Sequence, residues 1–576
     1  MKTISNSKIL IIILICSLFT LSCKSQQDIK PTEIPVVNSP VQWMVTELSF
    51  TSSKIYPNSF NDVNLDVVFT HDNGTSLIIP AFWDNANTWK VRFAPTLSGN
   101  WTYKTVCSDT LNTGLSKKTG NLTCAAYTGK LDIYKHGFIK TTPNVRYFTY
   151  ADGTPFFYLG DTHASMSQEP FETSVISGIS SQFKYLVDKR VEQGFTVYHS
   201  EPIGADYDLS DGFTSSDIFG FRDLDNRFKY IADKGLVHAN AELVFTAELG
   251  SKRANYPDAY LEKLCRYWVA RYSAFPVLWT TAQESDNDFY HNRLDTNGTS
   301  ENPYFDSTTN PWKLVANYIY KYDAYKHPLT AHQEFASLNG DGTAASNSSF
   351  RDLPGHTWYG AQWSPAKNDQ LDFNIPKDFW NNGQGKPTVN YEGLFDHLWT
   401  QEFGARMQGW TAYLNGIYGS GYGAEDIWLY NSNYDINTPT TRDGITITVA
   451  DKQIKWYDSV KLNSAVQMGY MHDFFNLIEW WNLTPRFDDP SWFSNNGSWY
   501  SVASKNSDLY VAYFYNNLSK NTGTLNNLSN AQFTVQWYNP ITGKFNTTKT
   551  VTIANNSYII GDKPDLNDWV LLLKKQ

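Results

Sequence analysis

The chain has few cysteines, few charged residues and no cluster of basic residues. Only five of its 576 residues are cysteine, and 18% are Asp, Glu, Lys or Arg. The formal net charge is −10. An acidic chain without a concentration of Lys and Arg is a poor partner for phosphate backbones, which argues against binding to nucleic acid.

Long hydrophobic runs are missing after the N-terminus, so no spanning helix is expected there. The one apolar run, residues 9–21, follows Lys2 and Lys8 and is shorter than the roughly 18 residues that a transmembrane helix needs. This pattern predicts a signal peptide over residues 1–22. Residues 20–23, Thr-Leu-Ser-Cys, resemble a bacterial lipobox, which implies cleavage before Cys23 and a lipid on its side chain. An ordinary signal peptide with a chance cysteine is the alternative.

The lipobox hypothesis predicts a bacterial cell-envelope protein, periplasmic or on the outer surface. Its only contact with a membrane would be the N-terminal lipid. Loss of Lys2 and Lys8 with the signal peptide changes the net charge to −12. The polar, proline-bearing residues 23–40 suit a tether between the lipid and the first domain.

Three cysteines remain after such processing. Cys107 and Cys124 lie between strand-like runs of a predicted exported protein, and a bridge between them would stabilise the fold by about 3 kcal/mol. A reduced pair is the alternative. Cys265 lies on an apolar helical stripe and is predicted to belong to the core.

Several motifs of catalytic chemistry are absent. The glycines at 416–423 lack the Lys-Ser/Thr that would end a phosphate-binding loop, and no serine elbow is found. His199 with Glu201, and His332 with Glu334, place metal-ligand residue types on single strands, but no third ligand is evident. We therefore expect no metal and no cofactor.

Aromatic residues are abundant, with 34 Phe, 36 Tyr and 20 Trp. Their flat faces can stack on the C–H faces of sugar rings, although many will be core. The pattern of elements divides the chain into three regions. Short strands and turns at 41–128 and again at 490–576 predict two antiparallel β-sandwiches, and alternating strands and helices at 140–485 predict a (β/α)8 barrel between them.

Eight apolar, β-branched runs are the candidate barrel strands. In chain order they are residues 156–161, 196–201, 237–245, 279–284, 327–332, 355–359, 387–392 and 426–430. A helix over about 401–414 precedes the last strand, and residues 457–483 predict a closing helix. Glu284 therefore ends strand four, and Glu392 ends strand seven.

These two glutamates are the predicted catalytic residues. Active sites of such barrels lie at the C-terminal ends of the strands, and cleavage of a glycosidic bond needs one protonated and one ionised carboxyl group. Two carboxyl groups about 5 Å apart separate their pKa values by repulsion, so one site supplies both states. Taken singly, either glutamate could instead be a strand-end salt-bridge partner.

Other polar and aromatic residues near the predicted strand ends are candidates for contact with sugar hydroxyls or rings. They are Asp161, His163, His199, Glu201, Gln283, Asp286, His332, His356, Trp358, Tyr391 and Trp428, with Glu242 as a further possibility. For each of them, a buried and satisfied polar group or a core aromatic is the alternative reading.

Several motifs resemble those of the apiosidase-like glycoside hydrolases. They are residues 153–162, 279–286, 389–392, 416–424 with 427–428, and 480–485. The resemblance covers roughly 140–485 and implies a barrel hydrolase acting on plant or microbial glycans. The C-terminal region resembles a module often labelled collagen-binding, which we do not take as its function.

The resemblance also implies roles for the two glutamates. Retaining glycosidases of the large barrel clan place the acid/base on strand four after an amide residue and the nucleophile on strand seven, which Gln283-Glu284 and Glu392 match. In such proteins the strand-four motif often has Gly before the acid, whereas Gln-Glu-Ser-Asp here makes Asp286 a rival for the acid role. The alternatives to a retaining hydrolase are a non-catalytic glycan-binding lipoprotein and a matrix adhesin.

Overall fold

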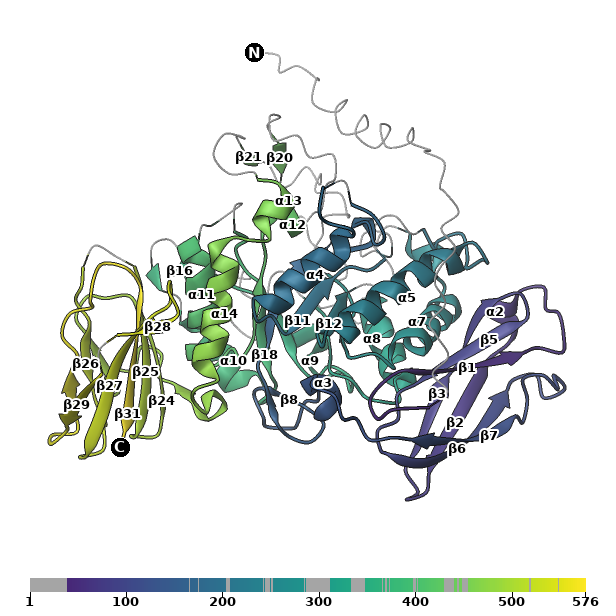
Figure 1. The fold of residues 1–576 in the computed structure, drawn as a ribbon, viewed down its shortest axis with the longest axis horizontal. Helices are drawn as coiled ribbons and strands as arrows, with labels where there is room; N and C mark the ends of the chain where they lie inside the picture. The colour runs from purple at the N-terminus through teal and green to yellow at the C-terminus, as the bar shows by residue number, and fades with distance from the viewer. Residues whose placement is uncertain are drawn as a thin grey trace, which may run out of the picture. The chain divides into compact units, whose positions relative to one another are not determined.

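Figure 1 shows the computed structural model of the chain, in which residues 36–576 form one compact unit. It describes residues 39–164, 166–174, 176–203, 208–241, 243, 249, 252–283, 285, 311–332, 348–364, 366–367, 370–371, 373–396, 400, 402–428, 440–442, 445–447, 454–516, 519–546 and 548–576. The predicted signal peptide with Cys23, and the candidates Glu242, Glu284 and Asp286, lie outside these residues.

The first region consists of two antiparallel sheets, as predicted. One has the order β1-β5-β4 and the other the order β3-β2-β6-β7. The strands are β1 (Thr46–Thr51), β2 (Leu65–His71), β3 (Ser76–Pro80), β4 (Phe82–Asn85), β5 (Thr88–Phe93), β6 (Gly99–Cys107) and β7 (Thr119–Cys124). Alternate residues such as Val67 and Phe69 on β2, and Val91 and Phe93 on β5, are fully buried in one apolar cluster. The period-two pattern of the sequence therefore specifies this core.

Cys107 and Cys124 are free and buried. The antiparallel register of β6 and β7 pairs Cys124 with Gly99, eight residues along β6 from Cys107. At about 3.4 Å per residue the two cysteines are on the order of 27 Å apart, far beyond the roughly 7 Å that a disulfide can span. A bridge between them is thus excluded by the strand register.

The central region is a parallel sheet of eight strands in the order β14-β13-β12-β11-β10-β19-β18-β15. An isolated parallel bridge joins Leu329 of β14 to His356, three residues before β15, so the sheet closes into a barrel. Its strands in chain order are β10 (Leu159–His163), β11 (Val197–Ser200), β12 (Val237–Ala241), β13 (Val277–Thr280), β14 (Leu329–Thr330), β15 (Tyr359–Gln362), β18 (Thr388–Glu392) and β19 (Ser420–Tyr422). The predicted parallel β/α barrel is confirmed.

Helices alternate with these strands and surround the barrel (Figure 1). They are α4 (Gln182–Glu192), α5 (Asp217–Asp233), α7 (Asp258–Tyr272), α8 (Pro311–Tyr322), α10 (Asn374–Asn382), α11 (Glu402–Leu414), α12 (Glu425–Trp428), α13 (Trp456–Ser459) and α14 (Asn463–Phe475), with the short α2 (Ser59–Asp62), α3 (Asp132–Lys135) and α9 (Ser348–Arg351) elsewhere. The predicted closing helix is divided into α13, α14 and a 3₁₀ turn at Trp480–Asn482. Apolar stripes such as Leu261, Leu264 and Trp268 of α7 are buried, as the helical period requires. Among the described helices, none combines the length and the apolar character needed to cross a bilayer.

The predicted position of strand eight is wrong. Residues 426–428 of the predicted strand belong to the short helix α12 (Glu425–Trp428), and strand eight is β19. The sequence around β19 is rich in glycine and therefore lacks the apolar, β-branched run that marks the other strands. A Cβ at Gly421 would lie 2.0 Å from the backbone oxygen of Tyr391, and one at Gly419 would lie 2.6 Å from Val389. Strand eight approaches its neighbours so closely that only glycine fits.

Two further strands are displaced from their predicted positions. Phe156 belongs to β9 (Pro155–Phe156), which forms an antiparallel hairpin with β8 (Phe148–Thr149), and the barrel strand begins at Leu159. Strand six begins at Tyr359, where the predicted run ends. Phe148 and Phe156 of the β8–β9 hairpin belong to the apolar cluster of the barrel core. The sequence of this hairpin is therefore as hydrophobic as that of a barrel strand, which explains why Phe156 was assigned to one.

The C-terminal region again consists of antiparallel sheets. One has the order β22-β24-β25-β31-β27-β28 with β29 beside β27, and the other the order β23-β26-β30. The strands are β22 (Thr484–Pro485), β23 (Phe493–Asn495), β24 (Tyr500–Lys505), β25 (Leu509–Phe514), β26 (Gly523–Leu525), β27 (Gln532–Asn539), β28 (Lys544–Phe545), β29 (Lys549–Thr552), β30 (Tyr558–Ile559) and β31 (Trp569–Lys575). The remaining short pairs are β16 (Ala366–Lys367) with β17 (Gln370–Leu371), and β20 (Thr440–Arg442) with β21 (Ile445–Ile447).

Both terminal regions are joined to the barrel helices by buried charges. The Arg92 guanidinium of β5 donates to Asp225 of α5 over 2.6 and 2.8 Å, and Arg271 of α7 donates to the same carboxylate. In the C-terminal region, Asp568 accepts two hydrogen bonds from Arg406 of α11. Removing either partner of such a pair leaves a buried charge uncompensated, so these contacts fix each region against the barrel.

Candidate functional site

A hydrogen bond joins the segment after strand four to the C-terminal end of strand seven. The side-chain amide of Gln283, three residues after β13, donates a hydrogen bond to Oε2 of Glu392, the last residue of β18. Glu392 is 7% exposed. Glu284 and Asp286 flank this contact in the sequence but lie outside the described residues. The hydrogen bond places the side chain of Gln283, the residue before Glu284 in the sequence, at the carboxylate of Glu392.

A bulge in strand seven directs Glu392 toward this point. The register pairs Asn390 with Ala361 and Glu392 with Gln362, so β18 has one extra residue, Tyr391. In a regular strand, Glu392 would follow an inward Tyr391 and face the surrounding helices. A bulge re-aims the following side chain, and here it turns Glu392 toward the barrel mouth, where Gln283 reaches it.

The backbone after Glu392 is held by a glutamine of helix α11. Gln408 Oε1 accepts a hydrogen bond from the Leu394 amide over 2.7 Å, and its Nε2 donates to the Leu394 carbonyl over 3.0 Å. A Cβ at residue 393 would lie 2.1 Å from Gln408 Oε1, so only glycine fits at Gly393. These contacts fix the chain that carries the carboxylate.

Below Glu392, the ring of Tyr391 contacts two buried histidines. It stacks on His199 with centroids 4.1 Å apart and rings nearly parallel at 4°, and it lies 4.9 Å from His332. Burial lowers the pKa of each imidazole to about 3, because charging it would cost its hydration. Both rings are therefore neutral at ordinary pH and add no charge to the site floor.

His199 is held in place within the barrel interior. Its Nε2 and the Tyr158 hydroxyl are hydrogen-bonded over 2.7 Å, and its Nδ1 lies 3.3 Å from the Thr162 hydroxyl. A Cβ at Gly160 would lie 2.1 Å from His199 Nε2. Glycine on strand one thus leaves the space that this ring occupies. The predicted candidates His199, His332 and Tyr391 are brought together with Glu392 and Gln283.

Asp161 and His163 lie on the other face of strand one, toward helix α4. Asp161 Oδ2 accepts hydrogen bonds of 2.6 Å from Arg190 Nε and from His163 Nε2, while His163 Nδ1 lies 3.0 Å from Glu169. All four residues are at most 1% exposed. Their polar atoms serve a buried charge network beside the barrel, and the structure does not bring them to the mouth with Glu392.

The charges in this network follow from its neighbours. Burial alone would lower the pKa of His163, but the carboxylates of Asp161 and Glu169 raise it to about 9. Burial likewise opposes ionisation of Asp161, yet Arg190 and His163 hold its pKa below the usual value. His163 is therefore an imidazolium between two carboxylates at neutral pH.

The remaining predicted residues are dispersed. Trp358 is fully buried in the barrel core. His356 is 1% exposed, and its Nε2 lies 3.2 Å from the Thr330 hydroxyl. Trp428 of α12 is half-buried and packs on Phe395 with centroids 4.7 Å apart. Glu201 is half-buried directly after β11, at the mouth end of the strand. Of these, Glu201 keeps a position from which it can reach a substrate, and Trp358 does not.

Two residues at this site were not predicted from the sequence. Gln362 ends strand six as the register partner of Glu392, and Gln408 holds the Leu394 backbone from a helix. The position of Gln362 at a strand end was a usable signal once strand six was placed correctly. No sequence signal distinguishes Gln408 from any other helical glutamine.

Within the described part of the chain, no three His, Cys, Asp or Glu side chains form a group that could hold a metal ion. The described site offers carboxyl, amide and neutral imidazole groups. A carboxylate held at the mouth of a barrel, over an uncharged floor, is placed for attack on an electrophilic carbon or for general base catalysis.

Family models match the two flanking regions. Residues 40–108 match a domain of unknown function, DUF5060, and residues 493–574 match a domain described as "putative collagen-binding domain of a collagenase". No curated protein matches the chain.

Solved structures with the same fold include proteins from Bacteroides vulgatus. One, described as a "putative glycoside hydrolase", is 17% identical, with a TM-score of 0.64 over 94% of this chain and 100% of its own. Another, a glycoside hydrolase family 5 protein, is 16% identical, with a TM-score of 0.57 over 77% of this chain and 94% of its own. At these identities the likeness shows that the fold is shared.

The barrel itself matches the family model of the apiosidase-like catalytic domain over residues 142–482, more than half of the chain. This range contains all eight barrel strands, Gln283 and Glu392. The chain belongs to the apiosidase-like family of glycoside hydrolases.

Proposed function

We propose that this protein is a retaining glycoside hydrolase in which Glu392 is the nucleophile and Glu284 is the acid/base. The observation that carries the proposal is the hydrogen bond from Gln283 to Glu392, which joins the ends of strands four and seven. Retaining hydrolysis needs two carboxyl groups on opposite sides of the scissile bond, and Glu284 directly follows Gln283 in the sequence.

The reaction takes two steps. In the first, Glu392 Oε attacks the anomeric carbon, the bond to the leaving oxygen breaks, and Glu284 donates its proton to that oxygen. In the second, Glu284 takes a proton from water, the water oxygen attacks the anomeric carbon, and the Glu392 carboxylate is released. Two inversions at the anomeric carbon give net retention.

The surroundings of Glu392 support its role as nucleophile. Gln283 orients one carboxylate oxygen, Gln408 holds the backbone two residues later, and the bulge at Tyr391 sets the direction of the side chain. A nucleophile held in its reactive direction loses little freedom on reaching the transition state. The neutral His199 and His332 below Tyr391 place no cation beside the carboxylate.

Stereochemistry tests the role of Glu392. Proton NMR of the first product should show the anomeric configuration of the substrate. With Glu392→Ala, azide should replace the carboxylate and give a glycosyl azide of inverted configuration. An inverted first product from the wild-type enzyme would rule out Glu392 as nucleophile.

Leaving-group dependence separates Glu284 from Asp286. Loss of the acid should slow substrates with poor leaving groups far more than aryl glycosides with good ones, because the latter need no proton. We expect this pattern for Glu284→Gln and near-uniform kinetics for Asp286→Asn. The reverse result would transfer the acid role to Asp286.

The substrate class follows from the family and remains broad. We propose plant or microbial polysaccharide-derived glycans, and a screen of pectin, arabinogalactan and algal oligosaccharides would identify the sugar. We further propose that each pair of flanking antiparallel sheets forms a β-sandwich.

The proposed location is the bacterial cell envelope, with Cys23 as the lipid-bearing residue. Labelling of cells with a fatty-acid analogue should mark the wild-type protein, and Cys23→Ala should be unlabelled and released from the membrane fraction. Labelling of the Cys23→Ala variant would contradict the assignment.

A further inference from the structure

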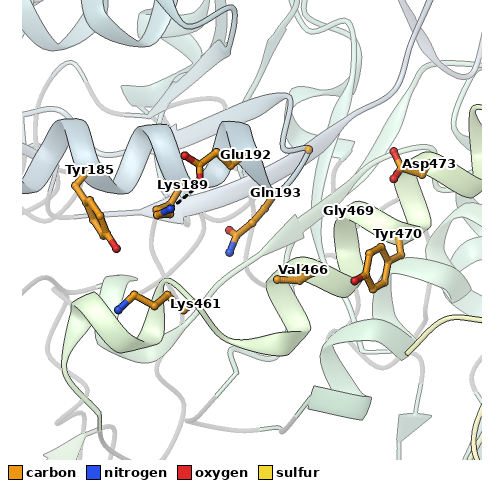
Figure 2. A pocket seen from close by; sticks show the side chains of 10 residues that line it. Tyr185, Lys189, Glu192, Gln193, Lys461, Val466, Gly469, Tyr470 and Asp473 are labelled. Atoms are coloured by element: carbon orange, nitrogen blue, oxygen red, sulfur yellow. Dashed lines mark hydrogen bonds and ion pairs between the residues drawn. The ribbon is translucent and has the colours of Figure 1, made fainter. Parts of the chain in front are cut away.

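A groove of about 450 Å³ lies between helices α4 and α14, on the outer wall of the barrel (Figure 2). Tyr185, Lys189 and Glu192 line it from α4. Tyr470 and Asp473 line it from α14, and Lys461 from the turn before that helix. Its volume lies within the roughly 300–1,000 Å³ of small-molecule sites. None of its lining residues belongs to the site at Glu392.

The groove begins on the side of the barrel mouth. Helices of a β/α barrel run antiparallel to the strands, so their N-terminal ends lie at the mouth side. Tyr185 is in the first turn of α4, and Lys461 directly precedes α14. Tyr470 and Asp473 are about two and three turns into α14. A chain bound in the groove can therefore extend from the mouth down the outer wall.

Two half-buried tyrosines form walls of the groove. Lys189 Nζ lies over the Tyr185 ring, 5.7 Å from its centroid, and Trp456 packs edge-on against the same ring with centroids 6.1 Å apart. Tyr470 is backed by Gly543, where a Cβ would lie 2.8 Å from the ring. Supported, partly exposed aromatic faces are suited to stacking on the C–H faces of sugars.

The polar groups of the groove are balanced in charge. Lys189 and Lys461 supply two ammonium groups, and Glu192 and Asp473 supply two carboxylates, with Lys189 and Glu192 paired over 2.6 Å (Figure 2). Ammonium groups that donate hydrogen bonds, next to carboxylates that accept them, suit sugar hydroxyl groups, which both donate and accept. A strongly charged ligand would lack a matching excess of opposite charge.

The floor of the groove is rigid. A Cβ at Gly469 would lie 2.2 Å from the carbonyl oxygen of Gln193, so the two helices meet closely there. The Gln193 amide donates to the Val460 carbonyl over 2.8 Å and accepts from Arg190 over 2.7 Å. A preformed floor reduces the entropy cost of binding a ligand.

We propose that this groove is a second, non-catalytic binding site for a neutral glycan chain of the polymer that is cleaved at the barrel mouth. The identity of that polymer rests on the proposed function, but binding in the groove does not. The site would hold the polymer near the mouth while individual bonds are cut.

Electrophoresis through gels that contain polysaccharide tests the groove without catalysis. The inactive Glu392→Gln protein is run in gels with arabinogalactan, galactomannan, xyloglucan or polygalacturonate. We expect retardation by at least one of the three neutral polymers and none by polygalacturonate. Adding Tyr185→Ala and Tyr470→Ala should weaken the retarding interaction about tenfold.

The matched control is Tyr318→Ala, which removes a half-buried tyrosine from α8, outside the groove. It should keep the full retardation, and melting curves should show that the variants are folded. In the active background, the groove variant should keep wild-type rates on a small aryl glycoside while losing rate on the polymer. This comparison separates failure of the groove from failure of the proposed hydrolase.

Several results would overturn the proposal. These are unchanged retardation in the folded double variant, no retardation by any neutral polymer, and retardation by polygalacturonate alone. Absence of hydrolysis by the wild-type protein would contradict the proposed function but leave the retardation test valid.

Discussion

Two histidines on adjacent barrel strands have opposite charge states. His163 of β10 lies between Asp161 and Glu169 on the helix side, and its pKa is raised to about 9. His199 of β11 lies inside the barrel against Tyr391 and Tyr158, and burial lowers its pKa to about 3. The residue type is the same and the neighbours differ, so the face of the strand decides the charge.

The difference separates two tasks of the barrel wall. The helix side holds paired charges that join β10 to α4 through Arg190. The interior holds neutral polar rings packed on Tyr391, the neighbour of Glu392. Substitutions on the helix side should therefore affect stability, and substitutions at the mouth should affect turnover.

Glu392→Gln should show the largest effect, and on turnover alone. Loss of a nucleophile commonly lowers kcat by about 10⁴-fold or more, whereas the isosteric amide keeps the packing. Steady-state kinetics and a thermal melt of the same preparation would measure both quantities. A folded variant with near-wild-type kcat would remove Glu392 from the mechanism.

Asp161→Asn should act in the opposite way. It leaves Arg190 and His163 with one carboxylate fewer in a buried network, which we expect to lower the free energy of unfolding by about 3–5 kcal/mol. Denaturant titration measures this change. The folded fraction should keep the wild-type KM, and a large rise in KM with unchanged stability would instead return Asp161 to the substrate site.

Gln283→Leu should lower kcat/KM by about 10–100-fold, the effect of removing one hydrogen bond to a charged group. The side chains have similar volumes, so the melting temperature should change little. Gln408→Leu is the comparison on the helix side of Glu392, since it releases the Leu394 backbone and should lower stability as well as rate.

The smallest effect is the pH dependence of stability. Below about pH 6.5, His199 and His332 bind protons in the unfolded chain but not in the folded one. The free energy of unfolding should therefore decrease as the pH is lowered, by up to about 1.4 kcal/mol per pH unit for each histidine. His163 acts oppositely, and its stabilisation is lost as pH rises through about 9. Denaturation of the wild type and His199→Gln from pH 7 to 5 should show a shallower slope in the variant.

The sequence alone predicted the order of the barrel and the position of Glu392. Apolar, β-branched runs followed by polar residues located strands two and seven closely, and Glu392 is the last residue of β18 as predicted, whereas strand four ends at Thr280, four residues earlier than predicted. Such runs are informative because parallel barrel strands are buried on both faces. The same pattern could not identify β19, where Gly421 approaches the Tyr391 carbonyl and the preceding Gly419 approaches the Val389 side chain.

The sequence pattern could not predict on which face of the sheet a strand-end residue lies. Asp161 and His163 follow the same kind of run as His199, yet they face α4, and the bulge that directs Glu392 toward Gln283 has no local signature. Cys107 and Cys124 similarly looked suited to a bridge until the register of β6 and β7 separated them. Each of these outcomes depends on pairing between distant segments.

The sequence by itself determined the alternation of strands and helices, because hydrophobic period and turn residues act over a few neighbouring positions. It also determined that a carboxylate ends strand seven. Only the tertiary structure decided which polar side chains share the barrel mouth, since strand register and one extra residue at Tyr391 turn Glu392 toward Gln283 and leave His163 on the other face. Register and bulges are set by contacts between strands, which no single segment of the chain encodes.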